Sequence, residues 1–293
     1  ALTSDSTISI DAGGTITDGG GDETTTDITA IDFTIADSTG IGTDADNALN
    51  LSVTNLTITT TGGNAFITEA NGIGLGTVNV VANELDIQAI TGDFRSSTSA
   101  VTAGNLTLTA TATDDAIGSS GTKINVELTG TLTASAADGT GGIFISQTGD
   151  LTLGAVNADV TSGGDVEIET TGTLGTTAEA DIVGNNVTLT LAADKLLTVD
   201  ADTSITGETN VTLVSDEMTL SSAGGDLIGA GAGGTLLLRA VENGTNLVLG
   251  SGAGADAAGT LALDTTDLEA LDPNSGTIQF GNAAIHGNTT ISN

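Results

Sequence analysis

Short runs in which an aliphatic residue alternates with Thr, Ser or Asp dominate this sequence, and Gly, Asn or Asp separates the runs. A period of two predicts β-strands with one buried face, and Gly-Gly or Asn-Gly steps supply the positive φ of tight corners. The apolar pairs that mark such runs include Ile8 and Ile10, Leu106 and Leu108, Leu151 and Leu153, Val187 and Leu189, Val211 and Leu213, and Leu261 and Leu263. Helical spacing is confined to Leu268–Leu271, so we predict an all-β fold with little or no helix.

The strand runs recur within longer internal repeats. Segment 27–35 resembles segment 100–108, and it resembles segment 181–189 as well. We divide the chain into units at 27–99, 100–180 and 181–258, followed by a variant terminal unit at 259–293. Self-similarity of this kind is typical of solenoids, in which each unit packs only on its neighbours. We therefore predict one continuous β-solenoid over residues 1–293.

The composition favours a thin core. The chain has 42 Gly and 5 Phe but no Trp, Tyr or Cys. A β-sandwich, whose sheets pack ~10 Å apart, usually draws on aromatic side chains that this chain mostly lacks. Strand runs that recur after roughly 8 to 12 residues give coils of about 20 to 25 residues. The expected architecture is a parallel β-helix of about a dozen coils.

The charge balance excludes several classes of partner. With 38 Asp and Glu against 4 Lys and Arg, the net charge of −34 leaves no basic surface for nucleic acid. No apolar run approaches the ~18 to 20 residues of a membrane helix, so we expect no membrane insertion of this segment. The sequence begins at Ala1 without a basic and apolar leader, which we interpret as a mature product or a piece of a longer chain.

Several motifs resemble one family. Segments 104–110 (GNLTLTA), 148–153 (TGDLTL), 259–264 (GTLALD) and 276–281 (GTIQFG) are similar to the degenerate repeats of filamentous-haemagglutinin-like large exoproteins of bacteria. The motifs are short, and they cover the chain loosely. The resemblance implies a right-handed parallel β-helix that is exported to the cell surface or the extracellular space. It also implies an extended adhesive or structural fibre.

Acidic turns raise the question of calcium. Ca²⁺ prefers oxygen ligands, which acidic loops supply. The candidate ligands are Asp18, Asp22, Glu23, Asp114, Asp115 and Asp256. A calcium-binding repeat would place such residues at one regular spacing, whereas these recur irregularly. Solvated carboxylates at corners are the competing interpretation. We therefore predict no required cofactor and only weakly bound Ca²⁺ on the acidic surface.

The sequence offers few residues that could form a catalytic site. His286 is the single histidine and stands in a turn-like segment, and the four cations Arg95, Lys123, Lys195 and Arg239 are scattered along the sequence. We predict that the chain is not an enzyme. The alternative is a β-helix that binds or cleaves polysaccharide with carboxylates on one face. A second alternative is ice binding through Thr-x-Thr triplets, which occur at Thr57–Thr59, Thr107–Thr109, Thr131–Thr133 and Thr188–Thr190.

Two further expectations follow from a stack of coils. Asn and Asp residues at equivalent corners are expected to form hydrogen-bonded ladders between coils. The end of a solenoid exposes strand edges, and these are expected to be covered by adjacent repeats or by identical subunits stacked end to end. The function we expect is a structural or adhesive fibre, stalk or biofilm-matrix element. Its other partner would be a host surface or a polysaccharide.

Overall fold

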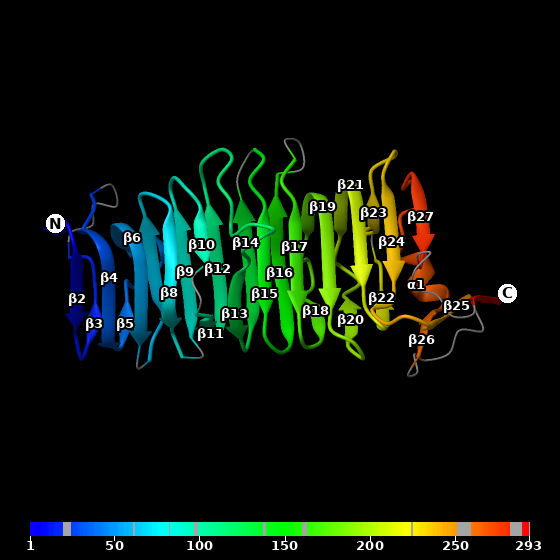
Figure 1. Ribbon diagram of the computed structural model, residues 1–293, viewed down its shortest axis with the longest axis horizontal. Helices are drawn as coiled ribbons and strands as arrows, with labels where there is room; N and C mark the ends of the chain where they lie inside the picture. Colours follow the sequence, from blue (N-terminus) through cyan, green and yellow to red (C-terminus); the bar gives the residue numbers. More distant parts are fainter. Residues whose placement is uncertain are drawn as a thin grey trace.

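The computed structural model describes residues 1–19, 25–60, 62–81, 83–96, 99–136, 139–159, 163–223, 225–250, 259–281 and 289–292. It is a rod of stacked coils in which the strands run across the long axis, and the two termini lie at opposite ends (Figure 1). The rod has about ten turns and 3% helix. The predicted all-β parallel β-helix is confirmed, with about ten turns where about a dozen were expected.

Strands of successive coils pair in columns along the rod. Column 1 contains β2 (Thr7–Asp11), β4 (Ile28–Ser38), β6 (Leu49–Thr60), β8 (Ile73–Asn79), β10 (Phe94–Ser96), β11 (Val101–Ala103), β13 (Ile124–Leu128), β15 (Ile143–Gln147), β17 (Val166–Thr170), β19 (Ile182–Leu191), β21 (Ile205–Val214), β24 (Thr235–Arg239) and β27 (Thr277–Phe280). Column 2 contains β3 (Thr15–Ile16), β5 (Gly40–Ile41), β7 (Ala65–Glu69), β9 (Glu84–Ala89), β12 (Asn105–Ala110), β14 (Thr131–Ala136), β16 (Leu151–Ala158), β18 (Leu174–Thr176), β20 (Leu196–Val199) and β22 (Glu217–Leu220). β1 (Leu2–Thr3) and β23 (Ile228–Ala230) pair with the first halves of β4 and β21, respectively.

The register of the strands defines the coil. Val166 of β17 pairs with Val187 of β19, and Val187 pairs with Val211 of β21. Each step from one of these valines to the next is one coil, and both steps fall within the predicted length of about 20 to 25 residues. The register defines single coils and no larger unit, so the division of the chain into long units at 27–99, 100–180 and 181–258 stays a prediction.

The core is a narrow stack of aliphatic side chains. Along β17 the residues alternate between buried and half-buried, and Val166 and Ile168 point inward. Parallel strands in register place like residues above one another, so Ile168 pairs with Leu189 and Leu189 with Leu213. All three side chains are fully buried. The absence of Trp and Tyr from the sequence fits this thin interior.

The coil pattern changes near the C-terminal end. Leu238 of β24 pairs with Phe280 of β27, and a long stretch of chain separates these two strands in the sequence. The intervening chain forms β25 (Asn246–Gly250), β26 (Thr260–Leu263) and the helix α1 (Thr265–Glu269). β25 pairs with β26 and with β28 (Thr289–Ser292) in a separate small sheet.

The helix α1 attaches to an open strand edge. Its Asp267 is buried, and Oδ1 accepts the backbone N–H of Leu220 in β22 at 2.7 Å. Asp264 caps the helix, because its side chain accepts the N–H groups of Thr266 and Asp267. The helix overlaps the single apolar i, i+3 window that the sequence contains. Part of the C-terminal end is therefore covered by the chain itself.

Candidate functional site

Three carboxylates meet at one corner of successive coils. Asp194 follows β19, Asp216 follows β21 and Glu242 follows β24, and one oxygen of each lies within 4.8 Å of the others. Among the described residues, it is the one group of at least three Asp, Glu, His or Cys side chains whose ligand atoms lie this close together. We call it the corner cluster. Sequence reasoning missed it, although the three residues follow one another at intervals of about one coil, which was the available signal.

Asp216 holds the corner cluster together through backbone hydrogen bonds. The residue is only 7% exposed. Its Oδ2 accepts the N–H of Asp194 at 3.0 Å, and its Oδ1 accepts the N–H groups of Val241 at 2.8 Å and Glu242 at 3.2 Å. Donors from the coil before and the coil after thus satisfy one carboxylate. A divalent cation could use the exposed oxygens of Asp194 and Glu242, but Asp216 already has a complete structural role.

Of the predicted calcium ligands that the structure describes, Asp18 lies far along the rod from Asp114 and Asp115. Asp114 accepts the backbone N–H of Thr140 in the next coil at 2.6 Å, and Asp115 accepts the N–H of Gly92 in the previous coil at 2.5 Å. The bond from the Thr140 N–H holds the pKa of Asp114 below its ordinary value. Asp18 lies half-buried at the other end of the rod, beyond β3. Asp22, Glu23 and Asp256 lie outside the described residues, and calcium binding stays a prediction.

Asn and Asp ladders link the coils, as the sequence predicted. The Asn186 side-chain N–H donates to Oδ1 of Asp165 at 2.8 Å, and the Asn210 side-chain N–H donates to Oδ1 of Asn186 at 2.8 Å. These residues occupy the same corner in consecutive coils. The side chain of Asn55 donates to Asp32 in the same way. Each bond satisfies a polar group along the rod axis and adds stiffness in that direction.

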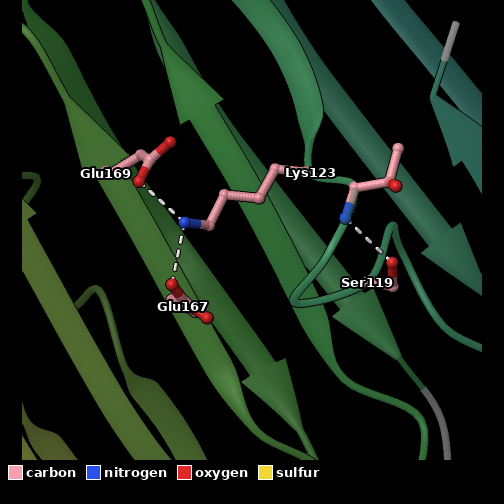
Figure 2. A network of polar contacts seen from close by, with 5 residues as sticks. Ser119, Lys123, Glu167 and Glu169 are labelled. Carbon is pink, nitrogen blue, oxygen red and sulfur yellow. Dashed lines mark hydrogen bonds and ion pairs between the residues drawn. The ribbon is translucent and has the colours of Figure 1, made fainter.

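One of the four cations forms a strap across three coils. The Nζ of Lys123, next to β13, lies 2.8 Å from Oε1 of Glu167 and 2.7 Å from Oε2 of Glu169, both on β17 (Figure 2). The Lys123 side chain therefore crosses the coil of β15. Burial alone would lower the pKa of Lys123, but its bonds to the two glutamates more than compensate and raise it. The strap is a structural contact on the outer face of column 1.

Two buried polar side chains accept N–H groups at the inside of corners. Glu69 is fully buried, and its carboxylate accepts the N–H of Val53 at 3.0 Å and that of Asn71 at 3.1 Å. Gln147 has the same role in another coil, where its Oε1 accepts the N–H of Leu128 at 3.1 Å. Burial raises the pKa of Glu69 to about 7. Neither residue was singled out from the sequence.

Hollows lie on the outer surface of the N-terminal half. The first has a volume of about 220 Å³ and is lined by outward side chains of β7, β9 and β12, together with the loop around η1 (Ala45–Asn47). The second has a volume of about 270 Å³ and shares Thr68 with the first. A third hollow of about 370 Å³ contains Arg95.

Among the described residues, the remaining cations are not brought together into one site. Lys195 and Arg239 lie beyond the Lys123 strap, next to β20 and in β24. His286 lies outside the described residues. The threonine triplets form no single row, because Thr107 pairs with Thr133 whereas Thr109 pairs with Ser135.

No protein-family model matches the chain, and no similar protein is found among the curated proteins or the solved structures. Within the described part of the chain, no helix has the length and apolar character needed to cross a membrane.

Proposed function

We propose that this chain is a segment of an extracellular fibre or stalk on the surface of a bacterium, with a mechanical and adhesive role. The observation that carries the proposal is the continuous stack of coils. Backbone hydrogen bonds run along the rod axis from β2 to β27, and Asn and Asp side chains add further bonds between some of the coils. A load along the axis would be shared by all the strands of a coil, as a stalk or spacer requires.

The acidic surface supports the same role. A net charge of −34 makes neighbouring rods repel one another, which keeps them soluble and separate. Few carboxylates have a cationic partner, because the chain has only 4 Lys and Arg. Divalent cations at millimolar concentration would gather around this surface without a dedicated site. The role needs no catalytic step and no cofactor.

The resemblance to filamentous-haemagglutinin-like exoproteins agrees with this function, as does the parallel β-helix itself. Exposed strand edges at the ends of the rod would pair with adjacent repeats of a longer chain or with identical subunits. At the N-terminal edge, the N–H groups of Leu2 and Ser4 and the carbonyl of Ser6 bond to the next coil. Backbone groups alternate in direction along a strand, so the N–H of Ser9 in β2 points away from the rod.

Electron microscopy and small-angle X-ray scattering of the purified chain test the proposal. We expect rods that associate end to end into thin fibres at physiological salt, where repulsion between the acidic surfaces is screened. Ser9→Pro should shorten the fibres, because it removes an outward N–H without breaking the pairing with β4. Ser9→Ala is the matched control and should form fibres like the wild type. A monodisperse rod at every salt and protein concentration would overturn the assembly part of the proposal.

A further inference from the structure

The first hollow is built on the outer face of column 2. Its floor consists of outward side chains from three consecutive coils, namely Thr68 of β7, Asp86 and Gln88 of β9, and Thr109 of β12. The loop around η1 forms one wall through Ala45 and Ala48. Phe66 lies beneath this loop and is only 8% exposed. The loop therefore turns a flat sheet face into a recess.

A second hollow adjoins the recess. The second hollow shares Thr68 and is lined by Asn50 at the beginning of β6, by Ala70 just after β7 and by Ile90 just after β9. The two hollows together cross several coils, which are spaced ~4.8 Å apart. We call the two adjoining hollows together the η1 groove. A sugar residue in an extended polysaccharide has a length close to this spacing, so successive sugars could meet equivalent side chains of successive coils.

The lining of the η1 groove combines apolar surface with hydrogen-bonding groups. Hydroxyl, amide and carboxyl groups come from Thr68, Gln88 and Asp86. Aliphatic surface comes from Ala45 and Ile90, which are both exposed. Asp86 is half-buried and lies beside Glu84 on the same strand. A lining with a few directed polar groups on an apolar background is typical of sites for small polar ligands.

The negative charge of the molecule restricts the class of ligand that the η1 groove could bind. Neither hollow contains Lys or Arg in its lining, and the whole chain carries a charge of −34. A polysaccharide with carboxylate or sulfate groups would be repelled by Asp86 and by the surface field. A cationic peptide would be attracted to the acidic surface everywhere, so it would gain little from this particular groove. Uncharged sugars avoid both difficulties.

We propose that the η1 groove binds an uncharged polysaccharide through the outward side chains of β7, β9 and β12. The inference deepens the proposed function and rests on it, because it names the ligand class of an adhesive fibre. Hydroxyl groups of the sugar would bond to Gln88, Asp86 and the threonines, and the apolar faces of the rings would lie against Ala45 and Ile90.

Calorimetric titration of the full chain with defined oligosaccharides tests this proposal. The probes are cellohexaose, maltohexaose and xylohexaose as uncharged chains, trigalacturonate as an acidic chain, and pentalysine as a cationic peptide. We expect at least one uncharged hexasaccharide to bind with a Kd that changes little between 0.05 and 0.5 M NaCl. Gln88→Ala and Thr109→Val should each weaken it by about tenfold, the equivalent of losing one or two hydrogen bonds.

Thr190→Val is the matched control. Thr190 is half-buried on the outer face of β19 in a similar alternating segment, and it lies far along the rod from the η1 groove. It should leave oligosaccharide binding unchanged. Failure of all three uncharged probes, or equal binding by the groove variants and the wild type, would overturn the proposal. Preferential, salt-sensitive binding of pentalysine would indicate a cationic peptide instead. Fibre formation by the same samples reports separately on the proposed function.

Discussion

Single polar residues inside the corners determine how stability depends on pH. Glu69 lies at an inward position of β7, where the pattern of burial otherwise places Ala65 and Ile67. Its carboxylate accepts N–H groups from two chain segments, yet the loss of hydration dominates and raises its pKa from 4.5 to about 7. The folded state therefore binds one more proton than the unfolded chain between these two pH values.

This excess proton predicts a loss of stability as the pH rises. The contribution of Glu69 is complete below pH 4.5 and disappears as the pH rises through 7, with an amplitude of about 3 kcal/mol. The variant Glu69→Gln should lack this slope. Chemical denaturation of both proteins from pH 4 to 8 measures it. Self-repulsion of the acidic surface has the same sign, so the difference between the two proteins is the relevant quantity.

Gln147 provides a reciprocal control for Glu69. Its Oε1 accepts the N–H of Leu128, while its Nε2 donates to the carbonyl groups of Leu128, Thr148 and Asp150. Gln147→Glu would place a carboxylate against these three carbonyl oxygens. That variant should acquire the pH slope that Glu69→Gln loses. Parallel pH profiles for wild type and both variants would contradict the assignment to Glu69.

The buried polar side chains at the corners could be predicted only in part from the sequence. Glu69 in AFITE, Gln147 in IFISQ and Thr170 in VEIET each occupy the third inward position of a short strand and precede a turn. A polar residue at an inward position was the signal that sequence analysis did not use. The partners of these side chains could not be predicted, because they depend on which residue of the previous coil lies above them.

The strands and the length of a coil can be predicted from the sequence more directly than the column to which each strand belongs. Alternation fixes which side chains point inward, and glycine or asparagine marks the corners. The similarity between segments 27–35 and 100–108 aligns Ile35 with Leu108. The pairing instead connects Ile35 to Ile58, Ile58 to Val78 and Val78 to Val101. Runs such as Thr-Leu-Thr occur on more than one face, so similarity of sequence does not identify the column.

The strap between β13 and β17 is the clearest contact that joins elements beyond nearest neighbours. Lys123 contacts both Glu167 and Glu169, and its side chain is only 15% exposed. Because the glutamates are about 35% and 44% exposed, solvent weakens the attraction. We expect Lys123→Met to reduce the free energy of unfolding by about 1 kcal/mol, since it also leaves two glutamates close together. Denaturation at 0.05 and 0.5 M NaCl measures the loss, which should shrink at high salt.

A double-mutant cycle separates the strap from simple packing. In the background Glu167→Gln/Glu169→Gln, the mutation Lys123→Met should cost much less than in the wild type. Exchange of Lys195 for Met is the control for removing one positive charge from a chain of charge −34. Equal losses in the presence and absence of the glutamates would mean that the aliphatic part of Lys123, and not its charge, stabilises the strands.

The whole molecule behaves as a linear array in which one coil is the smallest interchangeable part. Coils contact mainly the coils before and after them, so the stability of the rod is close to a sum over neighbouring pairs. Asn186 pairs with Asn210 and Val187 with Val211, which makes consecutive coils alike at this point. Ile182, Ile205 and Ile228 show the same relationship in the first halves of β19 and β21 and in β23.

Removal of one coil therefore gives the strictest test of the architecture. Deletion of residues 187–210 joins Asn186 to Val211, takes one strand from each column and leaves β17 opposite the second half of β21. The product should fold, with a maximum dimension in X-ray scattering shorter by about 5 Å and a similar midpoint of unfolding. Deletion of residues 187–198 removes half a coil and should abolish cooperative unfolding, because the strands that follow would meet the wrong faces. If both variants fold equally well, coils of this length do not determine the register of the rod. If neither variant folds, the stability of the rod depends on contacts between coils that are not nearest neighbours.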